Sequence, residues 1–208
     1  VYFLKDRNEI LAELDNKTSI STQFAVVVMH DEQKQAAQRF FKTPLIFSIQ
    51  EAKGLEYQNI ILYNFVSNES QSFNEICRDV RGEDLKKDFI FSRNKDKTDK
   101  SLEIYKFYIN ALYVGLTRAV VNLYWVEQKY QHAIFNLLGL EKASDYLDLA
   151  EQKSSLQDWQ REAQKLELQG KKEQADRIRR EILKEETPNW IVLKGSELKH
   201  LEHKALIE

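Results

Sequence analysis

The stretch FAVVVMHDEQKQAAQRFFKTPLIFSI, residues 24–49, decides the fold class of this chain. It opens with an apolar run (24–29) rich in β-branched residues, which is typical of a strand buried on both faces. Residues 31–41 follow at helical spacing and begin with two acids, which the helix dipole favours in a first turn. Pro44 ends that helix, and residues 45–49 form a second apolar run. Strand, helix and strand in this order predict a parallel sheet with helical crossovers.

The same alternation of predicted strands and helices continues further along the chain. Residues 59–66 (NIILYNFV) predict another strand, residues 101–117 a helix, and residues 120–126 (VVNLYWV) one more strand. We therefore expect an α/β domain over residues 1–150, with a parallel sheet flanked by helices. Residues 67–100 lack periodicity and carry nearly balanced charge, so they predict a charged, solvated insertion.

The remaining residues, 151–208, form a separate region that is predicted to be helical. Ser155 stands three residues before Asp158, which is the spacing of a capping box, and Gly170 is a suitable residue to follow the helix. Residues 171–186 predict a second helix, so we expect a helical hairpin extension. Our interpretation is a packing module or a surface for a protein partner.

Composition limits the classes of function. The chain has 208 residues, of which 42% are hydrophobic, and this suffices for a core of ordinary domain size. Its single cysteine, Cys77, cannot form an internal disulfide, which fits a reducing, cytoplasmic location. The sequence has no apolar run of about 18 residues, so no membrane partner is expected. The net charge is -2, and any nucleic-acid contact must therefore be local.

Two short motifs carry the candidate chemistry. The first, SIQEAKGLEY (48–57), joins two predicted strands. Ligands of open parallel sheets sit at the carboxyl ends of strands, so this turn is a candidate site. Gly54 would let a phosphate approach the backbone, and Glu56 could accept hydrogen bonds from a ribose. A glycine in such a turn can equally be structural.

The second motif, LYVGLTRA (112–119), places a permanent cation, Arg118, between a helix and a strand. Together the two motifs resemble motifs V and VI of superfamily 1 helicases of the UvrD-like group. The family forms are T-x-H-x-x-K-G-L-E-[FY] and L-x-Y-V-[AG]-[LIV]-T-R-A. Ser48 stands where the family has Thr, and Gln50 stands where it has His. The resemblance covers about residues 20–128.

The resemblance implies a fold and a set of roles. Such helicases bind ATP with Mg²⁺ between two RecA-like domains, and this chain resembles the second. It implies that Arg118 is catalytic and reaches the γ-phosphate, while Gly54, Glu56 and Arg118 form this domain's share of the ATP site. Ser48 and Gln50 would face single-stranded DNA, although glutamine lacks the aromatic face of histidine. No metal ligand is expected in this chain.

The sequence contains no G-x-x-x-x-G-K-[ST] phosphate loop. We therefore expect the chain to hold no cofactor and to be inactive alone, with ATP and Mg²⁺ bound in the full-length parent. Its expected partners are single-stranded DNA and the first RecA-like domain of the same parent, and the helical hairpin is a candidate surface for a protein partner. The alternative is a degenerate helicase domain that acts as a protein-interaction module. For Arg118 itself, the alternative to the catalytic role is a structural one, in which it caps a helix or pairs with a carboxylate.

Overall fold

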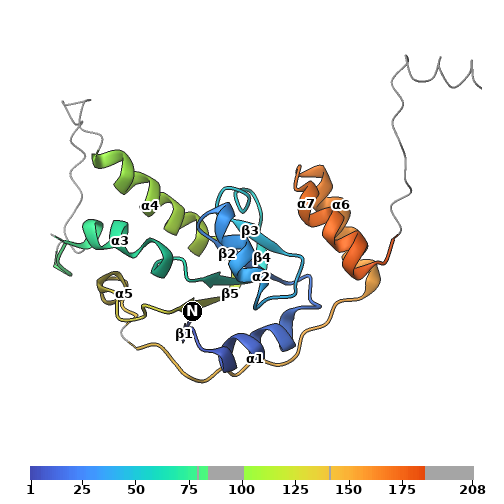
Figure 1. Ribbon diagram of the computed structural model, residues 1–208, viewed down its shortest axis with the longest axis horizontal. Coiled ribbons are helices and arrows are strands. Elements are labelled where there is room, and N and C mark those ends of the chain that lie inside the picture. The colour runs from blue at the N-terminus through green and yellow to red at the C-terminus, as the bar shows by residue number, and fades with distance from the viewer. Residues whose placement is uncertain (79, 84–100, 141, 186–208) are drawn as a thin grey trace, which may run out of the picture.

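The computed structural model describes residues 1–78, 80–83, 101–140 and 142–185 (Figure 1). Its centre is a five-stranded sheet with the order β1-β5-β4-β2-β3, and all neighbouring strands are parallel. The strands are β1 (Tyr2–Lys5), β2 (Phe24–Val28), β3 (Ile46–Ser48), β4 (Tyr57–Tyr63) and β5 (Ala119–Glu127). The predicted α/β fold with a parallel sheet is confirmed.

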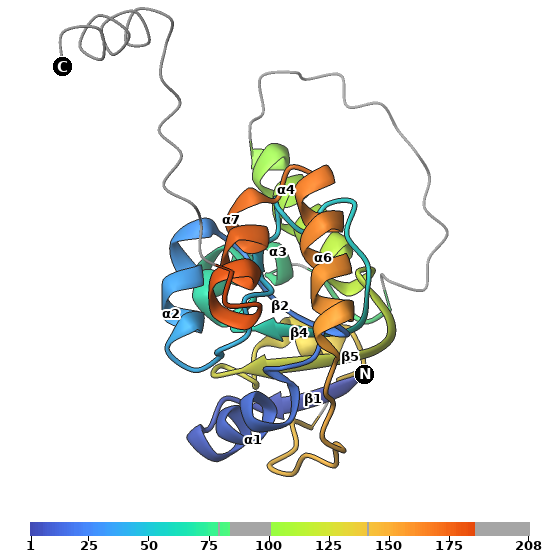
Figure 2. The same ribbon diagram turned by 90° about the vertical axis from the view of Figure 1, so that its right-hand side faces the viewer.

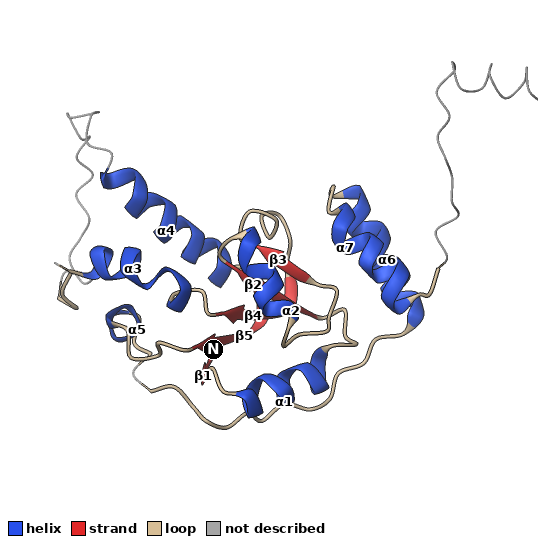
Figure 3. Ribbon diagram, in the orientation of Figure 1, coloured by secondary structure: helices blue, strands red, loops and turns tan. Residues whose placement is uncertain are grey.

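Helices surround this sheet, as the colouring by secondary structure shows (Figure 3). They are α1 (Asn8–Thr18), α2 (Lys34–Gln38), α3 (Ser70–Cys77), α4 (Ser101–Leu116), α5 (Ala133–Leu137), α6 (Leu156–Leu168) and α7 (Lys172–Arg177). Two 3-10 turns, η1 (Asp31–Gln33) and η2 (Ser67–Glu69), and one π-helical segment, η4 (Ile178–Ile182), complete the helical elements of the described residues. The helix predicted over residues 31–41 is thus shorter than expected and ends at Gln38.

The sheet separates two hydrophobic clusters. All five residues of β2 are buried, because helices cover both of its faces. Phe24, Val26 and Val28 pack with α1 and α2, whereas Ala25 and Val27 belong to the larger cluster on the opposite face. The helical residues of that larger cluster include Phe73 of α3, Leu112 of α4, Phe135 of α5, Trp159 of α6 and Ala175 of α7.

Two elements at the N-terminus were not predicted. The edge strand β1 pairs with β5, with Phe3 opposite Trp125, and α1 covers the adjacent face of the sheet. The segment after β4 also differs from the expected solvated insertion, because it begins with η2 and α3, and Phe73 of α3 is fully buried. Residue 79 and residues 84–100 of that predicted insertion lie outside the described residues.

The C-terminal helices begin and turn as the sequence indicates. The Ser155 side chain accepts from Asp158 N, and the Asp158 side chain accepts from Ser155 N, which completes a capping box. Gly170 follows α6 with φ +76°. The helices α6 and α7 lie side by side in both views and pack on the larger cluster of the sheet (Figure 2). Residues 186–208 of the predicted extension lie outside the described part of the chain.

Within the described ranges, no helix is both long and apolar enough to cross a membrane.

Candidate functional site

The first motif forms a turn that links β3 to β4 without a helix. We call residues 49–56 the β3–β4 turn. Its backbone is held by hydrogen bonds from Ala52 N to Ser48 O (2.9 Å) and from Leu55 N to Ala52 O (3.1 Å). Gly54 has φ +79°, a conformation that residues with a Cβ rarely adopt, and a Cβ built there would meet nothing within 4 Å. The turn therefore offers bare, exposed backbone at Gly54.

Arg118 lies beside the end of this turn. Its guanidinium donates to Val114 O (Nε, 3.1 Å), to Leu55 O (Nη1, 3.1 Å) and to Thr117 Oγ1 (Nη2, 3.1 Å). Its backbone oxygen accepts from Tyr57 N at 3.1 Å. A guanidinium has five N–H donors, so two remain without an acceptor among the residues that the structure describes. Arg118 is held in place and still has donors to offer.

Glu56 and Arg118 thus come together at the amino ends of β4 and β5, where Tyr57 pairs with Ala119. The Glu56 side chain is exposed and has no hydrogen bond or ion pair within the described part of the chain. Gly54 and Glu56 follow β3 in the chain, as the sequence predicts. Because β3 and β4 run in the same direction, the turn leads from the carboxyl end of β3 to the amino end of β4, and Glu56 lies directly before β4.

The two residues expected to face DNA have different environments. Ser48 is fully buried; its N–H donates to Glu51 Oε2 (2.9 Å), and its Oγ accepts from Glu51 N (3.4 Å). Gln50 is exposed, and its Oε1 accepts from Lys53 Nζ at 2.9 Å. The structure therefore brings Gln50 to the surface but turns Ser48 inward.

Gln50 and Lys53 line a cavity of about 140 Å³ together with residues of α4, among them Phe107 and Asn110. Sequence reasoning did not select these α4 residues. Their spacing of three residues places them on the same face of the helix. Apolar residues occur on every face of this helix, however, so the sequence pattern did not distinguish the face that lines the cavity. The cavity combines an aromatic ring, two amides and one cation.

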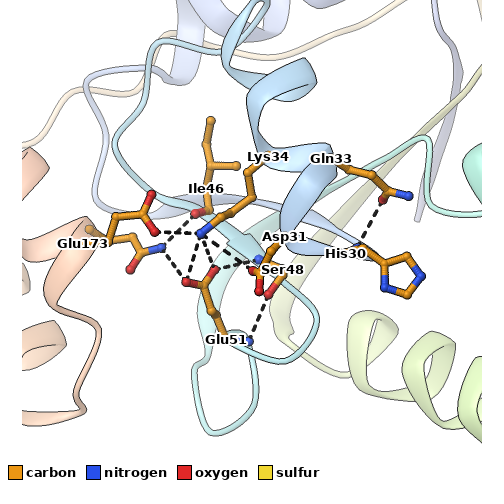
Figure 4. Close-up of polar contacts among 9 residues, drawn as sticks. His30, Asp31, Gln33, Lys34, Ile46, Ser48, Glu51 and Glu173 are labelled. Atoms are coloured by element: carbon orange, nitrogen blue, oxygen red, sulfur yellow. Dashed lines mark hydrogen bonds and ion pairs between the residues drawn. The ribbon is translucent and has the colours of Figure 1, made fainter.

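A polar cluster anchors the first half of the β3–β4 turn (Figure 4). Lys34 Nζ donates to Glu51 Oε1 (3.0 Å) and to Glu173 Oε2 of α7 (2.8 Å). Gln174 Nε2 donates to Glu51 Oε1 (3.3 Å) and to Ile46 O of the edge strand (3.2 Å). Burial by itself would lower the pKa of Lys34, but its hydrogen bonds to the two glutamates outweigh burial and leave that pKa raised.

A second contact anchors the end of the turn. Tyr57 is buried, and its hydroxyl donates to Glu162 Oε1 of α6 at 2.6 Å. Lys165 Nζ donates to Glu162 (3.2 Å) and lies 4.8 Å from the centre of the Tyr57 ring. Burial, and next the charge of Glu162, raise the pKa of Tyr57 well above its usual value. The hydroxyl therefore stays protonated and remains a donor.

Among the described residues, no group of three or more His, Cys, Asp or Glu side chains could hold a metal ion. In comparisons with known proteins, the chain matches no family model and no curated protein.

Proposed function

We propose that this chain is the second RecA-like domain of an ATP-dependent superfamily 1 DNA helicase of the UvrD-like group. The observation that carries the proposal is the pair of hydrogen bonds that joins Arg118 to the end of the first motif, from Arg118 Nη1 to Leu55 O and from Tyr57 N to Arg118 O. Two motifs that are distant in sequence thereby place a fixed cation, Arg118, and an exposed carboxylate, Glu56, at the same end of two adjacent strands.

These residues fit one side of a nucleotide site. Arg118 is permanently charged and is already oriented by three hydrogen bonds, so its remaining donors can meet phosphate oxygens without further ordering. Glu56 has no partner among the residues that the structure describes, so its carboxylate can accept from ribose hydroxyls, and Gly54 leaves room for close approach. Bound between the two domains of the parent, ATP would supply the phosphoryl group that is hydrolysed. An arginine finger of this kind contributes about 10³–10⁵ in rate.

Contact with single-stranded DNA is assigned to Gln50, with Lys53 as the neighbouring cation. Ser48 acts indirectly in this proposal, because its hydroxyl and N–H hold Glu51 and so shape the turn. Under this proposal, Mg²⁺ and most phosphate contacts belong to the first RecA-like domain.

A second candidate function is protein interaction through α6 and α7. Two apolar residues of α6 favour it, since Leu156 is 64% and Leu168 is 89% exposed. In that case Arg118 and Gln50 would have no role beyond the fold.

The proposal can be tested with this chain alone by titrating a fluorescent oligothymidine of about 20 nucleotides and following anisotropy at several salt concentrations. We expect salt-dependent binding, because lysine contacts with phosphates release counterions. Lys53→Ala should weaken binding and reduce the slope of log K against log salt by about 0.7. Gln50→Ala should weaken binding and leave the slope unchanged.

The matched control is Lys153→Ala, which removes another exposed lysine (59% exposed side chain) from a segment outside the site. It should bind like the unmodified chain. Absence of binding at low salt, or equal effects of Lys53→Ala and Lys153→Ala, would argue against a DNA-contacting turn and in favour of the interaction module.

A further inference from the structure

We propose that α6 and α7, together called the C-terminal helix pair, act as a positioning device for the β3–β4 turn. The residues concerned are Glu162 on α6 and Glu173 and Gln174 on α7. The inference rests on the proposed function, since the turn carries the residues proposed to meet nucleotide and DNA. It assigns a role to the helix pair that neither motif implies.

The helix pair holds the beginning of the turn through Glu51. Glu51 is the central acceptor there, because its carboxylate receives Lys34, Gln174 and the Ser48 N–H. The Lys34 side chain is only 11% exposed and forms ion pairs with both Glu51 of the turn and Glu173 of α7. The turn and α7 therefore bind the same cation. Removal of α7 would leave this cation with one strong partner instead of two.

The helix pair holds the end of the turn through Tyr57. This residue begins β4 and directly follows Glu56, and its buried hydroxyl has Glu162 as its acceptor. Tyr57 also pairs with Ala119 and donates its N–H to Arg118 O. A shift of α6 would therefore change the positions of both Glu56 and Arg118, because the Tyr57 side chain links α6 to both residues.

The exposed residues of the turn lie between these two anchors. Gln50 directly precedes Glu51, and Glu56 directly precedes Tyr57, so each of these two proposed ligand-binding side chains is one residue from an anchored neighbour. Positioning and ligand binding must then be coupled in both directions. Loosening the helix pair should weaken binding at the turn, and ligand at the turn should stabilise the helix pair.

Hydrogen exchange followed by mass spectrometry tests the positioning directly, without any ligand. Glu162→Ala and Gln174→Ala should each raise the exchange rate of peptides covering residues 49–57 at least fivefold, while peptides from β2 and β5 stay unchanged. Glu162→Gln should restore slow exchange, because its amide oxygen can still accept from Tyr57. Tyr57→Phe, which keeps the packed ring, should act like Glu162→Ala and serves if that variant fails to fold.

The matched control is Glu167→Ala. It removes a 2.6 Å ion pair with Arg179 inside the same C-terminal region, and that pair does not touch the turn. This variant should leave exchange at residues 49–57 unchanged. Equal exchange at the turn in Glu162→Ala and Glu167→Ala, or a uniform rise over the whole sheet, would overturn the positioning role.

A second arm measures oligothymidine binding by the same variants. Glu162→Ala and Gln174→Ala should bind at least threefold more weakly than Glu167→Ala, and oligothymidine should slow exchange in residues 156–177 of the unmodified chain. Equal affinities among the variants would overturn coupling to the site. If the unmodified chain does not bind DNA, the proposed function fails, while the exchange of residues 49–57 still decides whether the helix pair positions the turn.

Discussion

Replacing Glu127 by glutamine should destabilise this protein far more than an isosteric exchange at the surface. Glu127 ends β5 and is fully buried. Its Oε1 accepts from Val66 N (2.8 Å) and Trp125 Nε1 (2.8 Å), and its Oε2 accepts from Ser67 N (2.8 Å) and from the Ser67 hydroxyl. One carboxylate thus fixes the chain after β4 against the end of β5.

The expected magnitude follows from counting donors. Glutamine supplies one acceptor oxygen, and its NH₂ must replace the other. In the better orientation the NH₂ faces Ser67, whose hydroxyl can turn to accept, but the Ser67 N–H is left without an acceptor. A buried unsatisfied donor costs about 1–3 kcal/mol, and charge-assisted bonds are lost as well, so we expect a total of about 2–3 kcal/mol. For a chain of this size that corresponds to a melting temperature lower by about 4–12 °C.

Thermal and urea unfolding followed by circular dichroism would measure this loss. Because burial raises the pKa of Glu127, the measurement is made at about pH 8 to favour the carboxylate. Glu127→Ala, which leaves three N–H donors without acceptors, should cost more than Glu127→Gln. Glu167→Gln, at a half-exposed acid, is the control. A melting temperature for Glu127→Gln equal to that of Glu167→Gln would refute the donor count.

Three further outcomes are expected. Burial lowers the pKa of His132, so below about pH 6.5 the unfolded chain binds more protons than the folded chain, and the free energy of unfolding should fall as the pH falls. His132→Asn keeps a side chain that can cap α5 but removes the titrating group. Urea unfolding at about pH 5.5 and pH 7.5 should therefore show a smaller loss of stability for this variant than for the unmodified chain. Gly115→Ala should change the free energy of unfolding by less than about 1 kcal/mol, because the higher helix propensity of alanine offsets the close approach of its Cβ to Leu62 Cδ2 (3.2 Å). Gly115→Val adds two further methyl groups at this crowded position and should cost about 1–3 kcal/mol. The chain alone should show no DNA-stimulated ATP hydrolysis in a coupled assay, and turnover by a preparation free of other ATPases would contradict the assignment as one half of a motor.

The central strands were predictable because their burial leaves a direct signature in sequence. Apolar, β-branched runs at 24–29 and 45–49 mark strands covered on both faces, and the intervening polar helix requires a crossover that makes them parallel. Ser155 with Asp158, and Gly170, marked the ends of α6 for equally local reasons. Local chemistry determined all of these features.

The remaining features depend on contacts between distant segments. Nothing in the residues of β1 indicates that Phe3 pairs opposite Trp125. A serine at the end of a strand can face either side, so the burial of Ser48 required the structure. The hydrogen bonds from Arg118 to Leu55 O and from the Tyr57 hydroxyl to Glu162 also join residues far apart in the chain, and the spacing of residues in a sequence does not predict such contacts.

The central claim is tested most directly by introducing Arg118→Ala into the proposed two-domain parent and measuring its steady-state ATP hydrolysis. If Arg118 stabilises charge on the γ-phosphate, kcat should fall by about 10³ or more with little change in KM, and Arg118→Lys should restore little of it. Glu56→Ala should mainly raise KM, since ribose contact is similar in ground and transition states. Circular dichroism should show both variants folded. If folded Arg118→Ala keeps kcat within about twofold of the unmodified enzyme, then Arg118 only joins the two motifs and the motor assignment is wrong.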